Sequence, residues 1–115
     1  MLKDRLFLLN APFEDPAYPG AVFYCEHCLL MEGLIAGWPE LNQHIDIQRI
    51  DWPRPRPELV DLLGSENQSC PVLILSDSGE GCPGVQVHGD IFFINEKDAI
   101  LQALAHRHRL PAPHP

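Results

Sequence analysis

The sequence is poor in positive charge and contains no long hydrophobic run. Its 115 residues include 8 Lys and Arg against 16 Asp and Glu, which gives a formal net charge of −8. Nucleic-acid binding requires clustered Lys and Arg that release counterions from phosphates, so we expect no nucleic-acid partner. No apolar run approaches the length needed to cross a bilayer, and residues 1–9 lack the apolar core of a signal peptide. We therefore expect a cytoplasmic protein that does not bind a membrane.

Cysteine is also scarce, because the chain contains only four. Four cysteines do not describe the disulfide scaffold of a small secreted protein, and in a reducing compartment a close pair is more often redox-active or metal-binding. The sequence has no internal repeat and no domain linker. Since a chain of this length supports one hydrophobic core, we expect a single domain over residues 1–115 that is monomeric or weakly homodimeric.

The apolar residues that are present predict an alternation of strands and helices. Strands are expected at Arg5–Leu9, Ile45–Ile50, Val72–Leu75 and Ile91–Ile94, and helices at Glu26–Gly37, Pro57–Leu63 and after an N-cap at Asn95 that Asp98 completes. Residues 10–24 are expected to form a long loop, 85–88 an irregular lead-in to the last strand, and 110–115 a loose tail. The order β-α-β-α-β-β-α predicts an α/β fold with a parallel β-α-β unit, an antiparallel pair and a mixed four-stranded sheet covered by helices.

Two cysteines form the CxxC motif Cys25-Glu26-His27-Cys28 at the predicted start of a helix. A spacing of three residues brings the two sulfurs within reach of a disulfide. The free N–H groups and the dipole of the helix start stabilise a thiolate, so Cys25 is the expected nucleophile and Cys28 the resolving thiol. A protonated His27 favours that thiolate while Glu26 opposes it. We therefore assign His27 a supporting catalytic role.

The context of the motif resembles the thioredoxin superfamily. The run Phe23-Tyr24-Cys25-Glu26-His27-Cys28 follows a first strand, and Ser69-Cys70-Pro71-Val72 opens a third one. Members of this superfamily carry a CxxC that faces a cis-proline. The resemblance implies a thioredoxin-like fold, a cis peptide bond before Pro71, and a substrate backbone that pairs with Cys70 and Pro71 like an added strand.

A second segment resembles the glutaredoxin and glutathione transferase branch of that superfamily. Residues 94–100, Ile-Asn-Glu-Lys-Asp-Ala-Ile, resemble the strand-to-helix junction at which an acidic residue and a hydroxyl bind the γ-glutamyl end of glutathione. Glu96 matches the acidic residue, and Lys97 stands where the hydroxyl residue would be. This implies Glu96 as a substrate-binding residue and glutathione as a co-substrate, with no cofactor required. The whole chain also resembles a small bacterial family of uncharacterised thioredoxin-like proteins, which brings no established activity.

Three functions stay open at this point. The leading hypothesis is a thiol-disulfide oxidoreductase that acts on a protein or on a low-molecular-weight thiol or disulfide. The second is a metal-binding module in which Cys25, Cys28 and Cys70 hold zinc or an iron-sulfur cluster. The third is a non-enzymatic domain that binds a partner through the aromatic residues of loop 10–24. These aromatics either cover the dithiol, line a substrate groove or fill a gap, and Tyr24 is the candidate substrate contact among them.

Overall fold

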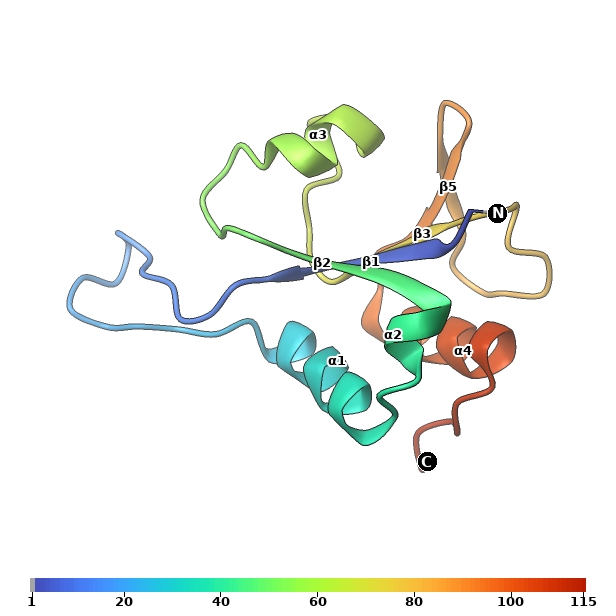
Figure 1. Ribbon diagram of the computed structural model, residues 1–115. Coiled ribbons are helices and arrows are strands. Elements are labelled where there is room, and N and C mark those ends of the chain that lie inside the picture. Colours follow the sequence, from blue (N-terminus) through green and yellow to red (C-terminus); the bar gives the residue numbers. More distant parts are fainter. Residues whose placement is uncertain (1) are drawn as a thin grey trace.

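Five short strands form one mixed sheet that carries helices on both faces (Figure 1). The computed structural model describes residues 2–115. The strands are β1 (Asp4–Leu9), β2 (Ile45–Ile50), β3 (Val72–Leu75), β4 (Gln86–His88) and β5 (Ile91–Ile94). The helices are α1 (Glu26–Gly37), α2 (Leu41–His44), α3 (Pro57–Leu63) and α4 (Lys97–His108). Of these, α2 is a four-residue helix that the sequence pattern did not predict.

The strand order across the sheet is β2-β1-β3-β5-β4. Strands β1 and β2 pair in parallel, whereas β1 with β3 and β3 with β5 pair antiparallel. The predicted parallel β-α-β unit and the predicted antiparallel pair are both confirmed. Strand β3 is buried along its whole length, as its unbroken Val-Leu-Ile-Leu run indicates for a central strand covered on both faces.

The sheet has five strands instead of the predicted four. Residues 86–88, expected to be an irregular lead-in, form β4 and pair antiparallel with β5. Every residue of β4 is exposed, and Val87 keeps 59% of its surface in contact with solvent. Gly89 makes the tight turn into β5 with a positive φ of 59°, which glycine adopts at little cost. An edge strand without a buried face leaves no alternating apolar pattern in the sequence, so this strand escaped prediction.

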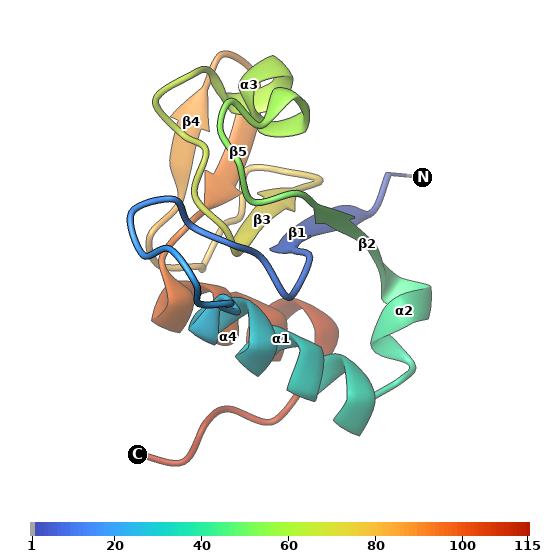
Figure 2. The same ribbon diagram turned by 90° about the vertical axis from the view of Figure 1, so that its left-hand side faces the viewer.

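The helices divide between the two faces of the sheet. Figures 1 and 2 show α1 and α4 together on one face and α3 on the other. Helix α3 begins with Pro57 at its first position and ends at Gly64, whose φ is 82°. Both boundaries are as the sequence predicts. No helix within residues 2–115 is long and apolar enough to cross a membrane.

Loop 10–24 contains no helix or strand, yet it is held by its own aromatic residues. The backbones of Phe13 and Phe23 exchange two hydrogen bonds, of 2.9 and 2.8 Å. The Phe13 ring also stacks on Trp52, with the ring centroids 5.2 Å apart and the planes 8° from parallel. Tyr18 meets Phe23 edge to face. Three of the loop aromatics therefore pack against one another and against the segment after β2.

The C-terminal tail, expected to be loose from Leu110, is anchored at that residue. Leu110 is buried, with 8% of its surface exposed. Residues 111–113 line a shallow cleft together with apolar residues of α1 and α4. The tail has no regular structure after its anchor.

Candidate functional site

Cys25 is the N-cap residue of α1 and lies half-buried between α1 and the Cys70–Pro71 segment. Its backbone is extended, with φ −78° and ψ 114°, and its Sγ accepts a hydrogen bond of 3.1 Å from the backbone N–H of Cys28. The sulfur thus takes the place that a Ser, Thr or Asp oxygen holds in most N-caps. A helix N-terminus stabilises negative charge, so this position favours the thiolate.

The pKa of the Cys25 thiol is lowered to about 6. The largest cause is the hydrogen bond that the Cys28 thiol gives to the Cys25 sulfur; the backbone amide of Cys28 and the positive charge of His27 add to it, and burial opposes it. His27 itself is exposed on the first turn of the helix. A thiol with this pKa is mostly thiolate at neutral pH, and the thiolate is the nucleophilic form.

Cys28 lies one turn further into the helix and keeps only 2% of its surface exposed. Its Sγ accepts a hydrogen bond of 3.5 Å from the backbone N–H of Leu9, at the end of β1. The pKa of this thiol is raised well above its usual range, first by the hydrogen bond to Cys25 and then by burial. The two pKa shifts have opposite directions, so at neutral pH they favour a Cys25 thiolate beside a protonated Cys28 thiol.

The Cys70–Pro71 segment meets the dithiol from the sheet side. The peptide bond between Cys70 and Pro71 is cis, and the Cys70 carbonyl oxygen lies 3.8 Å from the Sγ of Cys25, where it accepts a hydrogen bond from the protonated form of that thiol. Pro71 is buried, whereas Cys70 is half-buried. Burial raises the pKa of the Cys70 thiol to about 12. The backbone of Cys70 is thus the part that contacts Cys25, while its thiol stays protonated.

The three thiols do not form a metal-ligand set. Residues 2–115 contain no group of three or more His, Cys, Asp or Glu side chains placed to hold a metal ion. The Cys25 and Cys28 sulfurs each accept a hydrogen bond from a backbone N–H, at 3.1 and 3.5 Å. Cys28 is buried, whereas Cys25 and Cys70 are half-buried.

Glu96 caps helix α4, a role that the sequence assigned to Asn95. Its Oε2 accepts a hydrogen bond of 2.7 Å from the N–H of Asp98 and its Oε1 one of 3.3 Å from the N–H of Ala99. Asn95 instead accepts a bond of 2.6 Å from the Gln86 side chain across the β4–β5 pair. The carboxylate that the resemblance assigned to glutathione is therefore already used within the fold. The expected Asn95 cap is wrong because the helix begins one residue later.

Sequence reasoning missed Arg56, which is buried behind the site with 5% of its surface exposed. Its Nε and Nη2 donate to the Trp52 carbonyl at 2.8 and 2.6 Å, and its Nη1 donates to the Gln68 carbonyl at 2.6 Å. No ion pair within residues 2–115 involves it. Its charge lowers the pKa of the Cys70 thiol against the effect of burial. An arginine in a proline-rich link is normally exposed, so no local signal marks it.

A cavity of about 350 Å³ opens beside Cys25 and Cys28. It is lined by Leu9, Asn10, Ala11, Tyr24, Cys25, Cys28, Leu29, Glu32 and Arg49. Tyr24 is 60% exposed and borders the cavity next to Cys25, as its proposed contact role requires. The last aromatic residue of the loop therefore forms part of the cavity wall.

Fold and site together define a mixed α/β protein with a CxxC dithiol at the start of a helix, its first thiol activated and its second buried. The chain belongs to the family described as "Protein of unknown function (DUF3088)", whose model matches residues 3–112. Searches among curated proteins and among solved structures found no match. The family description names no activity, and the chemistry of the site is what points to a function.

Proposed function

We propose that this protein is a thiol-disulfide oxidoreductase with a thioredoxin-like fold. The observation that carries the proposal is the unequal placement of the two thiols. Cys25 is the half-buried N-cap of α1, and its Sγ accepts a hydrogen bond of 3.1 Å from the backbone N–H of Cys28, whereas Cys28 keeps only 2% of its surface exposed. The lowered pKa of Cys25, about 6, agrees with this placement. Two cysteines that only pack in a core would both be buried, protonated thiols, without one of them placed at a helix N-terminus.

The reaction follows from the two protonation states. The Cys25 thiolate attacks one sulfur of a substrate disulfide; that S–S bond breaks, a substrate thiolate leaves, and Cys25 is joined to the other half as a mixed disulfide. The Cys28 sulfur then attacks Cys25, forms the Cys25–Cys28 disulfide and releases the second substrate half, which takes up the proton of Cys28. The protein dithiol loses two electrons and the substrate gains them. Two equivalents of a monothiol reverse the exchange and regenerate the dithiol.

The arrangement of elements supports the thioredoxin-like part of the proposal. Strands β2, β1, β3 and β5 form a mixed sheet in which β1 and β2 are parallel, and β4 adds one exposed edge. Helices α1 and α4 share one face, and α3 lies on the other (Figure 2). The segment that opens β3 also brings the Cys70 carbonyl to Cys25, in the way the resemblance leads us to expect.

The test is the redox midpoint of the Cys25/Cys28 pair. The protein is equilibrated in a series of glutathione buffers of increasing reduction potential. Free thiols are then trapped by alkylation, and the state of Cys25 and Cys28 is read by mass spectrometry. We expect one two-electron transition that links Cys25 to Cys28. Cys28→Ser abolishes this transition, and the matched control Cys82→Ser retains it. If no poise yields the Cys25–Cys28 disulfide, the proposed reaction is wrong.

A further inference from the structure

The cavity beside Cys25 has a composition that selects among disulfide substrates. It lies where the ends of β1 and β2 meet the first half of α1, elements that neighbour one another in Figures 1 and 2. Its volume of about 350 Å³ suits a small molecule, because cavities that bind such ligands span about 300–1,000 Å³. Leu9, Ala11, Tyr24 and Leu29 give it apolar walls. Both active-site sulfurs line the same space.

One ion pair adds charge to this cavity beside the Cys25 thiolate. Glu32 on α1 accepts two hydrogen bonds of 2.7 Å from Arg49 on β2, one from Nε and one from Nη2. The side chains keep 31% and 43% of their surfaces exposed. A guanidinium carries five N–H donors, and Nη1 of Arg49 has no acceptor among residues 2–115. The carboxylate oxygens of Glu32 likewise retain lone pairs for a further donor.

An ion pair of this kind discriminates between ligands by their charge. A purely anionic ligand that approaches Arg49 is repelled by Glu32, and a purely cationic ligand that approaches Glu32 is repelled by Arg49. A ligand that carries both an ammonium and a carboxylate gains from both partners at once. Among the described residues that line the cavity, the Cys25 thiolate is the one further charge, and it faces the sulfur of every ligand alike.

We propose that this cavity binds a small zwitterionic disulfide, namely the disulfide of a thiol that carries an α-amino acid group. The carboxylate of the ligand contacts Arg49, its ammonium contacts Glu32, and its sulfur reaches Cys25. The inference rests on the proposed oxidoreductase function and adds a substrate class to it. The exchange is the one given above: the Cys25 thiolate displaces one amino acid thiolate, and the second leaves as a thiol when Cys28 closes the protein disulfide.

The experiment traps the first step in a Cys28→Ser background, in which the mixed disulfide cannot resolve. Three disulfide probes that differ in charge are compared: cystine, which is zwitterionic; cystamine, which is cationic; and dithiodipropionate, which is anionic. Intact-mass spectrometry follows adduct formation at Cys25. We expect cystine to react roughly fivefold faster than either of the others, since an exposed charge contact contributes up to about 1 kcal/mol.

Charge variants in the same background separate the two partners. Arg49→Gln is expected to move the preference toward cystamine, and Glu32→Gln toward dithiodipropionate. Arg5→Gln is the matched control, because it removes a positive charge from the neighbouring strand β1 but lies outside the cavity lining. The opposite directions of the two shifts guard against misfolding, which would slow all three probes together.

The outcomes distinguish the two proposals. If Cys25 forms no adduct with any probe, the proposed oxidoreductase function is wrong, and the proposed substrate class is wrong as well. If all three probes react at the same rate, or if Arg49→Gln and Glu32→Gln leave the order of rates unchanged, the substrate class is wrong while the function stands.

Discussion

At the scale of single residues, the thiol of Cys25 is controlled by groups that are close in sequence. Cys28 gives it a side-chain and a backbone hydrogen bond, and His27 adds positive charge. The motif was recognisable from spacing alone. The sequence left open how strongly Cys25 is activated, because His27 and Glu26 have opposite effects; the hydrogen bond from the Cys28 thiol decides it.

The first prediction concerns the pH dependence of Cys25. Thiolate forms as pH rises through the pKa, so the alkylation rate of Cys25 is expected to rise with a midpoint near pH 6 and to level off above it. Iodoacetamide labelling, read on the Cys25 peptide by mass spectrometry, gives the profile. Cys28→Ala removes the largest cause of the shift and is expected to move the midpoint up, toward the ordinary value of about 8.5. Cys82→Ala is expected to leave it unchanged. A wild-type midpoint at or above the ordinary value would contradict the assignment.

The second prediction concerns Arg56, which joins the segment after β2 to the one before Cys70. Arg56→Gln removes charged hydrogen bonds to the Trp52 and Gln68 carbonyls. We expect a loss of about 3 kcal/mol in the free energy of unfolding, measured by urea denaturation. The midpoint of Cys25 alkylation should also rise, because the positive charge of Arg56 interacts with the Cys25 thiolate.

Arg56→Lys separates the two effects of Arg56. Lysine keeps the positive charge but lacks the several N–H donors of the guanidinium. Arg56→Lys is therefore expected to restore the midpoint of Cys25 alkylation more fully than the free energy of unfolding. If Arg56→Gln lowers stability but leaves the Cys25 midpoint in place, Arg56 has a structural role alone.

At the scale of elements, the boundaries of α1 and α3 followed the sequence closely because local signals set them. Pro57 and Gly64 bracket α3, and Trp38 caps α1 where glycine and proline stop it. The start of α4 did not follow, because Glu96 caps the helix although N-caps usually are Ser, Thr, Asp or Asn, while the Asn95 side chain accepts a hydrogen bond from Gln86 instead. Strand β4 was not predicted for a related reason. Its residues are all exposed, so only the pairing with β5 distinguishes it from a loop.

The third prediction uses the glycines of these helices. Gly33 lies in the exposed middle of α1, and a β-carbon built there meets no atom within 4 Å. Gly33→Ala is expected to raise the free energy of unfolding by about 1 kcal/mol, because alanine has the higher helix propensity. Gly64→Ala is the contrasting variant, since φ is positive there and the new β-carbon lies 2.9 Å from the His88 ring. It is expected to destabilise by more than about 1 kcal/mol. Equal effects in urea denaturation would contradict this reasoning.

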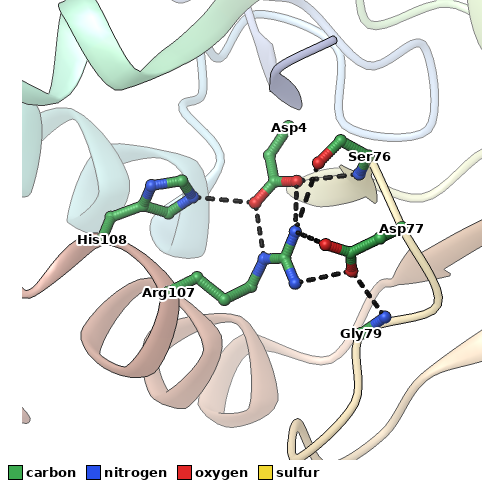
Figure 3. A network of polar contacts seen from close by, with 6 residues as sticks. All are labelled: Asp4, Ser76, Asp77, Gly79, Arg107 and His108. Carbon is green, nitrogen blue, oxygen red and sulfur yellow. Dashed lines mark hydrogen bonds and ion pairs between the residues drawn. The ribbon is translucent and has the colours of Figure 1, made fainter. Parts of the chain in front are cut away.

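At the scale of the whole molecule, a buried ion cluster joins the two ends of the described chain (Figure 3). Asp4 at the start of β1 accepts hydrogen bonds of 2.7 and 2.8 Å from Arg107 and lies 2.8 Å from the Nε2 of His108, both on α4. The backbone N–H of Ser76 donates a further bond of 2.8 Å to Asp4. Arg107 extends the cluster to Asp77. These contacts fix α4 against the sheet on the side where β1 begins.

The fourth prediction concerns this cluster. Asp4→Asn leaves Arg107 without its buried partner and is expected to cost about 3 kcal/mol in the free energy of unfolding.

Burial alone would raise the pKa of Asp4, but the hydrogen bonds from His108, Arg107 and Ser76 hold that pKa well below its usual range. The stability from this ionised carboxylate is therefore present above the pKa of an unfolded Asp, about 3.9, and is lost as pH falls below it. Urea denaturation between pH 3 and 7 measures both effects. Asp61→Asn, on the exposed face of α3, is the control. Glu32 and Asp77 also have lowered pKa values and contribute to the loss of stability at low pH, so Asp4 is excluded as a source only if Asp4→Asn keeps the whole of the wild-type pH dependence.

The sequence by itself determined the strands with unbroken apolar runs, three of the four helices and the CxxC dithiol, because each depends on residues within a few positions of one another. The tertiary structure alone decided the partners that lie far apart along the chain. Arg49 reaches Glu32 across 17 residues, and Arg107 reaches Asp4 across 103. No local pattern encodes such pairings, since they arise only when the sheet and helices place the side chains together. The dithiol therefore follows from the sequence, while the charged cavity beside it follows from the fold.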